Sequence, residues 1–486
     1  MTGDFLIVKK YLSNPLVTGT IFLTLAGTTS RFMGFFFRIF LNNVMGSTGL
    51  GLYQLVIPLM SVCMSLCCNG FQTATSKLVA EKPQNRQIIL ICAIIMSATI
   101  ALLLTIIMYS NANYISLCIL SEPRCTELVK ALSFSILPAA IHSCINGYYY
   151  GLKKAAIPAA TQLIEQTARI GTCYLIYAIL SDGGSCFKPV YSIYGIVAGE
   201  ASATVFSVIT IKKDFSYFKI SVKSLKTTAY GMAALFIPLS LNYILASFSS
   251  SAENVLIPRT LKLYGLSPAL ALDIFGTISG LTLPVLLFPG VLCSCACVML
   301  LPSVSEANAA GKDAKITKTI NSCALFGLCF GLIFTCIFYL LSDFIGDFLF
   351  SSKLCGYFLR RLCFLCPLMH ISGMLCSILH GLGKAKQVLF VNLLTCAIRI
   401  LMIMLLVPHY GIDAYLWAML VSHVFMTLAV GILTCHTAHK LKKPAHTPGI
   451  PEYVQTHKNT DYTRERYSPV LVSILITSSV STKSGT

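Results

Sequence analysis

The sequence predicts an all-α polytopic membrane protein with about twelve transmembrane helices, arranged as two parallel six-helix lobes around a central cavity. Three observations support this class: the composition, the spacing of the apolar stretches and an internal repeat. Apolar residues make up 56% of the 486 positions, charged residues make up 11%, and the mean hydropathy is +0.76. This composition excludes a water-soluble globular protein.

Apolar stretches long enough to cross a bilayer recur along the whole chain. A helix of about 20 residues covers the roughly 30 Å of hydrocarbon. The first stretch is too long for a cleaved signal peptide and carries Arg31, so we expect it to be a spanning helix. The predicted spans are residues 16–41, 51–76, 87–110, 128–150, 155–180, 190–211, 227–251, 268–300, 316–341, 357–380, 387–407 and 412–437.

A short sequence motif occurs twice, 230 residues apart. Residues 151–155 read GLKKA and lead to Arg169, and residues 381–385 read GLGKA and lead to Arg399. In both copies a basic loop is followed by an arginine deep in an apolar segment. Duplicated half-units are typical of transporters, and a buried cation marks a functional position.

The repeat also predicts the domain organisation. We expect an amino-terminal lobe over residues 1–220 and a carboxyl-terminal lobe over 221–443, each with six helices. Because each lobe has an even number of helices, the chain begins both lobes on the same side of the membrane, so the two repeats have parallel orientations. Residues 444–486 are polar apart from Val470–Ile476, which is too short to span a bilayer, so we expect a disordered cytoplasmic tail.

Lysine and arginine fall on alternate sides of the predicted spans, with 20 on one side and eight on the other. The positive-inside rule places the richer side, and both termini, in the cytoplasm. The net charge of +18 is therefore explained by topology. No aromatic residues interleave a basic stretch outside the spans, so we do not expect nucleic acid as a partner.

The 21 cysteines are scattered through apolar segments and do not form a secreted disulfide framework. Cys363 and Cys366 form a lone CxxC without further ligands or polar partners. We expect these thiols to pack as small apolar side chains, and we predict no metal site and no cofactor.

Prolines and glycines within the spans predict helix geometry. Pro58 and Pro284 lie at matching depths in the two halves, where freed carbonyls allow a helix to bend during gating. Proline is also common in membrane helices without any such role. The GxxxG pairs at 276–280 and 327–331 are best explained by tight helix packing.

Charged side chains inside the spans carry the functional prediction. An ionised group near the bilayer centre costs about 2.5 to 3.5 kcal/mol, so each should face a cavity or a partner. The histidines at 142, 370, 380 and 423 are scattered singly, and we expect packed or polar contacts for them. The charged and polar candidates are Arg31 and Arg38 on the first span, Glu165 and Arg169 on the fifth, Glu200 on the sixth, Glu253 and Asn254 on the seventh, and Arg399 on the eleventh.

Two interpretations of these residues remain open. In the structural one, Glu165 and Arg169 neutralise each other at i,i+4 spacing and fix their helix to a neighbour. In the functional one, four arginines outnumber the acids, and the basic cavity binds a phosphate through guanidinium forks. The predicted substrate-binding residues are Arg31, Arg38, Arg169, Arg399 and Asn254, and the predicted coupling or ion-pair residues are Glu165, Glu200 and Glu253.

Several segments resemble one branch of a known superfamily. Residues 19–39, 49–55, 72–77 and 253–259 are similar to the polysaccharide-transporter branch of the multidrug/oligosaccharidyl-lipid/polysaccharide exporter superfamily. The resemblance covers about residues 15–440. It implies a fold like that of MATE transporters and the lipid II flippase, with alternating access. It also implies that Arg31 matches an arginine in the central cavity of the lipid II flippase.

The same resemblance implies a cargo and a location. The cargo would be an undecaprenyl-pyrophosphate-linked sugar precursor for spore-cortex peptidoglycan, and the location the bacterial cytoplasmic membrane. We therefore expect a monomeric flippase whose partners are a lipid-linked oligosaccharide precursor and membrane lipids.

Two other functions remain open at this stage. A cation-coupled multidrug antiporter should have a net acidic cavity, whereas the predicted cavity is basic. A polyprenyl-phosphate-dependent membrane enzyme would need clustered acids at the membrane face, and Asp343 and Asp347 have no large loop beside them. We therefore predict that the protein is not an enzyme.

Overall fold

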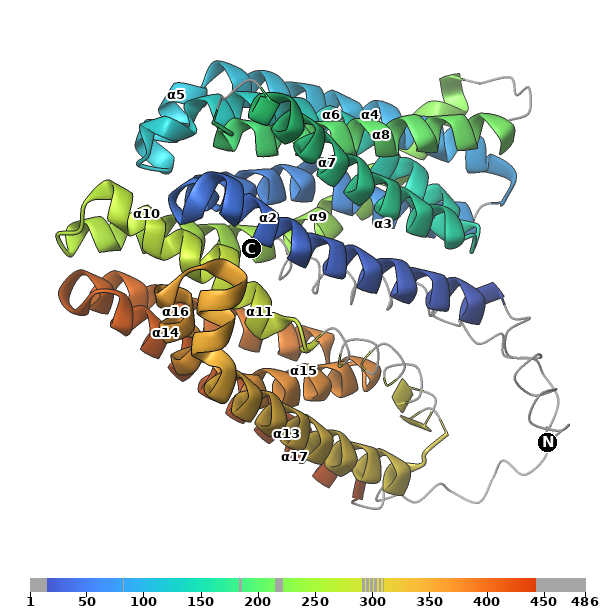
Figure 1. Ribbon diagram of the computed structural model, residues 1–486. Coiled ribbons are helices and arrows are strands. Elements are labelled where there is room, and N and C mark those ends of the chain that lie inside the picture. Colours follow the sequence, from blue (N-terminus) through green and yellow to red (C-terminus); the bar gives the residue numbers. More distant parts are fainter. Residues whose placement is uncertain are drawn as a thin grey trace, which may run out of the picture.

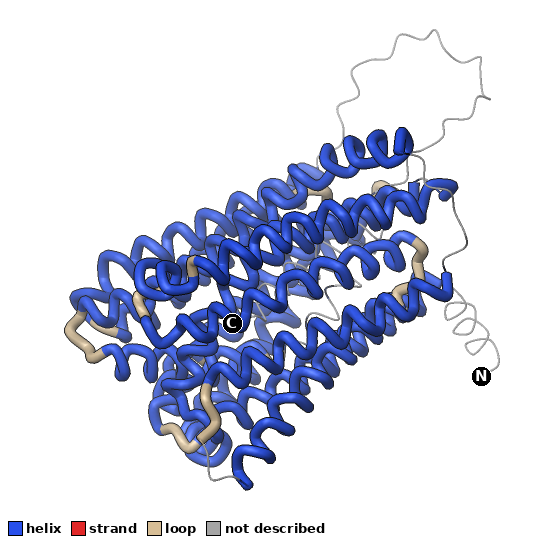
Figure 2. The backbone as a smooth tube through the Cα atoms, turned by 90° about the horizontal axis from the view of Figure 1, so that it is seen from above, coloured by secondary structure: helices blue, strands red, loops and turns tan. Residues whose placement is uncertain are grey.

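The computed structural model describes residues 15–81, 83–182, 186–214, 222–290 and 310–442, together with isolated positions between 293 and 308. All secondary structure within this part of the chain is helical (Figures 1 and 2). The predicted all-α class is therefore confirmed. The predicted tail over 444–486 lies outside the described residues.

Each predicted span corresponds to one helix or to a run of consecutive helices. The first half of the chain contains α2 (Pro15–Met64), η1 (Ser65–Asn69), α3 (Gly70–Glu81), η2 (Pro83–Asn85), α4 (Arg86–Ser110), α5 (Ala112–Tyr114), η3 (Ile115–Ile119), η4 (Pro123–Cys125), α6 (Thr126–Gly151), α7 (Ala156–Asp182) and α8 (Pro189–Asp214). The second half contains α9 (Val222–Leu263), α10 (Pro268–Gly276), η5 (Thr277–Thr282), α11 (Leu283–Leu287), α13 (Asp313–Phe344), η6 (Ile345–Leu349), α14 (Lys353–Leu362), α15 (Leu365–Gly381), α16 (Ala385–Tyr410) and α17 (Ile412–Lys442).

Length and composition make this a multi-pass membrane protein. Eight helical segments among the described residues are long and apolar enough to cross a membrane, or nine if α14 and α15, bent by 54°, form one span. One of the eight, Phe22–Glu81, is 60 residues long and covers two predicted spans. The predicted spans on α7 and α9 are not among the eight, and these helices carry buried charged residues.

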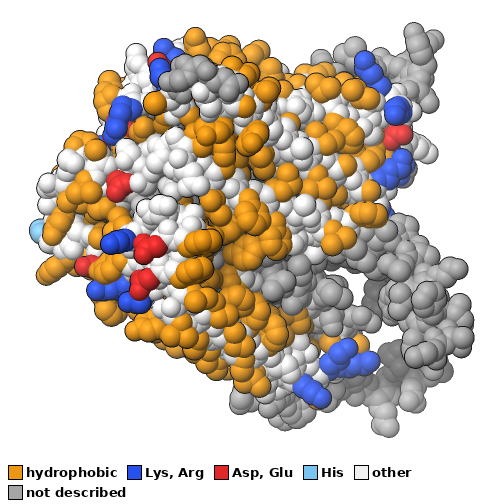
Figure 3. Space-filling view, in the orientation of Figure 1, with side chains coloured by type: hydrophobic (Ala, Val, Ile, Leu, Met, Phe, Trp, Pro, Cys, Tyr) orange, Lys and Arg blue, Asp and Glu red, His pale blue; other side chains and the backbone are white. Residues whose placement is uncertain are grey.

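The helices form two groups that run roughly along one direction. One group contains α4, α6, α7 and α8, the other contains α13 to α17, and α2, α3, α9 and α10 lie between them (Figure 1). The groups lie close together near α10 and α14 and are farther apart at the opposite end. Apolar side chains cover the middle of the visible face, and charged side chains gather at its two ends (Figure 3).

Glycines allow the closest helix contacts. A Cβ at Gly327 on α13 would lie 3.1 Å from the backbone nitrogen of Ile371 on α15. A Cβ at Gly276 on α10 would lie 2.7 Å from the backbone nitrogen of Gly51 on α2. The packing role predicted for both GxxxG pairs is confirmed, because a Cβ at Gly276 or at Gly331 would come closer than 3.0 Å to the backbone of the facing helix.

The repeated loop also repeats in backbone geometry. Lys153 N donates to Tyr150 O at 3.0 Å, and Gly383 N donates to His380 O at 3.0 Å, with equivalent bonds from the residues on either side. Lys153 (φ 61°) and Gly383 (φ 74°) both adopt the left-handed conformation. The motif found in the sequence is thus one structural turn used twice.

The two prolines proposed for gating lie beside irregular turns. Pro58 is inside α2, seven residues before the π-helical turn η1, and its carbonyl accepts a 3.1 Å hydrogen bond from the Ser251 hydroxyl on α9. Pro284 is buried in α11, directly after the π-helical turn η5. Such turns mark places where a helix deviates from regular geometry, but the gating role stays a prediction.

We predict that Gly199→Ala lowers the free energy of unfolding by about 1–3 kcal/mol, because the new Cβ would overpack the α7–α8 contact. That Cβ would lie 2.8 Å from the Glu165 carbonyl oxygen. Gly171→Ala on α7 is the matched control, because nothing lies within 4 Å of its Cβ position. Alanine there should be neutral or raise stability by about 0.5–1 kcal/mol. Thermal unfolding in detergent measures both, and equal effects would contradict the packing argument.

Candidate functional site

Four charged or titratable side chains meet inside the first group of helices, and we call them the amino-terminal cluster. They are His142 on α6, Glu165 and Arg169 on α7, and Glu200 on α8. Arg169 Nη2 donates to Glu165 Oε1 at 2.6 Å and lies 4.0 Å from Glu200 Oε1. His142 Nε2 lies 2.7 Å from Glu200 Oε2, and the Glu200 side chain is only 3% exposed. Three helices therefore share one buried charge network.

Close packing of α8 on α7 builds this cluster. Gly195 and Gly199 face Arg169 and Glu165, and a Cβ on either glycine would come within 2.9 Å of the α7 backbone. Because α8 approaches so closely, Glu200, next to Gly199, reaches the ion pair on α7. The contact of His142 with Glu200 could not be predicted from the sequence, because α6 and α8 are distant along the chain.

The amino-terminal cluster can bind a proton or a cation. One ligand atom from each of His142, Glu165 and Glu200 lies within 4.8 Å of the other two. Two carboxylates beside one arginine leave a site that a proton or small cation can neutralise. The predicted absence of a metal site is not tested by this geometry and stays a prediction.

Arg169 retains an unused hydrogen-bond donor. Its Nε is buried and has no hydrogen-bond partner among the described residues, while Nη2 is held by Glu165. A buried donor without a partner costs free energy, about 1–3 kcal/mol for a polar group. An anionic ligand could satisfy this donor, which favours the functional interpretation of the Glu165–Arg169 pair over a purely structural one.

A second network, the carboxyl-terminal cluster, surrounds the arginine of the second repeat. Arg399 Nη1 on α16 donates to both oxygens of Glu253 on α9 at 3.2 Å. Its Nε donates to the Ser422 hydroxyl at 2.9 Å, and Nη2 lies 3.4 Å from His423 Nδ1, both on α17. The Tyr415 hydroxyl donates to Glu253 at 3.3 Å. Both repeat arginines are thus paired with acids. Arg169 pairs with Glu165 on its own helix, whereas Arg399 pairs with Glu253 on another helix.

The remaining predicted residues lie on the central helices. Arg31 and Arg38 are partly buried on α2, and Asn254 is buried on α9 with 6% of its surface exposed. Tyr53 on α2 interacts electrostatically with both Arg38 and Arg169. Arg38 and Arg169 therefore both lie near Tyr53, which connects the first span with the amino-terminal cluster.

At the end where the helix groups meet, several contacts join the two halves of the chain, and we call them the closed-end contacts. The Ser47 hydroxyl on α2 donates to the Asp273 carboxylate on α10. Asn42 Nδ2 donates to the carbonyl oxygen of Phe350 at 3.1 Å. Gly51 and Gly276 let α2 and α10 cross with their backbones in close approach.

A salt-bridge triad adds to the closed-end contacts. Glu122 Oε1 accepts from Arg124 Nε at 2.7 Å, and Glu122 Oε2 lies 3.3 Å from Lys262 Nζ on α9. Burial raises the pKa of Glu122, but the hydrogen bonds and charges of Arg124 and Lys262 outweigh it and hold this pKa below the ordinary value. The triad therefore stays ionised at neutral pH and is lost only as the pH falls below about 4.5.

Comparisons with known proteins give a consistent result. The family model described as "Polysaccharide biosynthesis protein" matches residues 16–266, and the model described as "MatE" matches residues 271–405. Stage V sporulation protein B of Bacillus subtilis (strain 168) is 23% identical over 426 residues, covering 84% of this chain and 82% of that protein.

Solved structures show the same fold. An inward-facing multidrug resistance MATE family transporter of the MOP superfamily superposes with a TM-score of 0.69 at 13% identity, covering 86% of this chain and 96% of that one. The inward closed conformation of the lipid II flippase MurJ superposes with a TM-score of 0.67 at 14% identity, covering 87% and 90%.

The helical architecture and the buried charge clusters define a multi-pass membrane protein with the fold of MATE transporters. The first family model covers more than half of the chain, so this protein belongs to the polysaccharide biosynthesis protein family. The resemblance found in the sequence is confirmed, and so is its extension over most of the chain.

We predict that Glu253→Ala lowers the free energy of unfolding by about 3–5 kcal/mol, because Arg399 would remain buried without a counter-charge. The double variant Glu253→Ala/Arg399→Met should be more stable than the single one, since it leaves no unpaired charge. Thermal unfolding of the two single variants and the double variant measures the coupling. Additive losses would show that the 3.2 Å pair is not an energetic unit.

Proposed function

We propose that this protein is a flippase that moves an undecaprenyl-pyrophosphate-linked sugar precursor across the bacterial cytoplasmic membrane by alternating access. The names of its relatives, a stage V sporulation protein and a lipid II flippase, support this class of cargo. The observation that carries the proposal is the pair of partly buried repeat arginines, Arg169 and Arg399, each paired with an acid. We propose spore-cortex peptidoglycan as the polymer that this precursor supplies, because one relative is a sporulation protein.

The proposed lobes are residues 1–220 and 221–443, which rock about the central helices. The basic loops lie in the cytoplasm, together with both termini, as the positive-inside rule predicts. The closed-end contacts then face outward and must break when cargo leaves. Pro58 and Pro284 allow α2 and α11 to bend during this movement. The protein acts as a monomer and is not an enzyme.

Exchange of partners at the arginines couples cargo to a proton or cation. Glu165 and Glu200 hold Arg169, and Glu253 holds Arg399, when no cargo is bound. A proton or cation on these carboxylates releases guanidinium donors, which then bind pyrophosphate oxygens. Arg31, Arg38 and Asn254 on the central helices complete the anion site, while the polyprenyl chain stays in lipid.

A second candidate is a cation-coupled multidrug antiporter. The observation that favours it is the acidic part of the amino-terminal cluster, where two carboxylates and a histidine converge. A drug antiporter would move cationic compounds and would not need its arginines. The choice between the two functions therefore depends on the charge of the cargo and on the role of the arginines.

We predict that Arg31→Ala and Arg399→Ala lose head-group translocation at least tenfold per folded and inserted molecule, because a charge-assisted hydrogen bond to phosphate is lost. Vesicles with defined pyrophosphate-linked and neutral head groups measure this. Arg259→Ala, an arginine on the predicted outer side, is the control. Unchanged translocation in both variants would contradict the arginine hypothesis, and transport of cationic drugs instead would favour the antiporter.

We predict that a disulfide between Ser47→Cys and Asp273→Cys arrests transport, because it fixes α2 to α10 at the closed end. Reduction should restore transport to the level of the single variants. Each single cysteine variant is the control for the 21 native cysteines. Full transport with a formed cross-link would show that this end need not open.

A further inference from the structure

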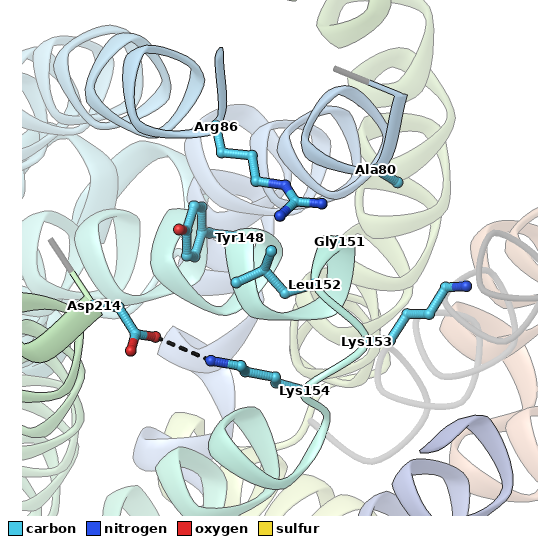
Figure 4. A pocket seen from close by; sticks show the side chains of 8 residues that line it. All are labelled: Ala80, Arg86, Tyr148, Gly151, Leu152, Lys153, Lys154 and Asp214. Atoms are coloured by element: carbon cyan, nitrogen blue, oxygen red, sulfur yellow. Dashed lines mark hydrogen bonds and ion pairs between the residues drawn. The ribbon is translucent and has the colours of Figure 1, made fainter. Parts of the chain in front are cut away.

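A cavity of about 620 Å³ lies at the end of the first helix group, among α3, α4, α6, α8 and the turn between α6 and α7. Its polar lining consists of Arg86, Tyr148, Lys153, Lys154 and Asp214 (Figure 4). Cavities of this size are typical of small-molecule sites. Lys154 begins the turn before α7, so the cavity lies ~22 Å along the helix from Arg169 and is separate from the amino-terminal cluster.

The charges of this cavity favour an anion. Lys154 Nζ lies 3.4 Å from Asp214 Oδ2, so these two charges offset each other. Arg86 and Lys153 add two further positive charges. Arg86 Nε donates to the Val79 carbonyl at 3.4 Å, which fixes the guanidinium so that its terminal nitrogens point toward the turn at Gly151 (Figure 4).

The backbone at Lys153 is strained. It adopts φ 61°, where a side chain with a Cβ costs about 1–2 kcal/mol relative to glycine. The equivalent residue of the second repeat, Gly383, has the same turn with φ 74° and no such cost. The positive-inside rule accounts for basic residues on this side of the membrane. It does not account for a lysine at a position where the backbone conformation favours glycine.

The second repeat serves as an internal comparison. It has Gly383 in place of Lys153 and Ile378 in place of Tyr148, at the same offset of 230 residues. The turn is therefore shared, whereas the lysine and the tyrosine belong to the first copy alone. Ser121 (φ 54°) and Ser351 (φ 49°) also adopt this conformation, so the strain at Lys153 supports a ligand role only together with the charged cavity beside it.

We propose that this cavity is a second anion site that binds a phosphate group at the membrane surface, distinct from the central arginines. The Arg86 guanidinium offers a planar fork to phosphate oxygens, and Lys153 contributes a point charge, while Lys154 stays paired with Asp214. Tyr148 supplies a hydroxyl and a ring face for the rest of the ligand. The phosphate can belong to an anionic lipid head group or to a soluble phosphorylated compound, and the chemistry is the same.

The test measures binding, so it does not depend on the proposed transport activity. Inorganic pyrophosphate is titrated by calorimetry into purified full-length protein that carries Arg31→Ala, so that the proposed central anion site is weakened and the soluble source is probed at the cavity. Nanodiscs with phosphatidylglycerol or phosphatidylcholine, followed by native mass spectrometry, probe the lipid source. Binding of either phosphate compound should weaken at least tenfold in Arg86→Gln/Lys153→Gly. Lys384→Gln in the second repeat is the matched control and should stay within twofold.

Lys153→Gly alone separates a ligand role from a folding role. It should raise the thermal midpoint, because glycine relieves the strain, and it should still weaken phosphate binding. Arg31→Ala should leave binding in the cavity unchanged. The proposal is overturned if neither source binds, if the double variant binds both sources as tightly as the native protein, or if Arg31→Ala abolishes the binding.

Discussion

An arginine inside an apolar layer keeps its charge, because its guanidinium cannot be deprotonated in a protein. The chain must therefore place a carboxylate or an anionic ligand beside every such arginine. Arg169 and Arg399 meet this requirement with Glu165 and Glu253. The helix packing around each cluster, and any exchange of partners with a cargo, depends on this single electrostatic constraint.

The two clusters meet the constraint in different ways. Arg169 finds its acid four residues away on the same helix, whereas Arg399 takes Glu253 from a helix of the central layer. Moving α9 relative to α16 would separate the second pair but not the first. The first cluster therefore suits local binding, and the second is sensitive to the relative position of the two helices.

The sequence predicted the helical class, the repeat, the buried arginines and the tight glycine contacts. These depend on composition and short spacing, which a linear sequence displays directly. The contact of His142 with Glu200, and of Ser422 with Arg399, could not be predicted, because these pairs join helices through tertiary packing. The 54° bend within the span predicted over 357–380 was also missed, although Pro367 stands four residues after the break at Cys363. Proline cannot donate to the carbonyl four residues before it, and the Cys363 carbonyl accepts from the Thr335 hydroxyl at 3.0 Å.

The crossing of α2 and α10 brings backbone against backbone at Gly51 and Gly276. The nearby Ser47 and Asp273 side chains are polar. When the two helices separate, both side chains can form hydrogen bonds to water in place of the bond between them. Leu50 on α2 and Leu272 and Phe275 on α10 are fully buried around this crossing, so separating the two helices exposes apolar surface to water. The heat-capacity change of a transition follows the apolar surface that it exposes. Opening at this end should therefore have a positive heat-capacity change, and its equilibrium should curve with temperature.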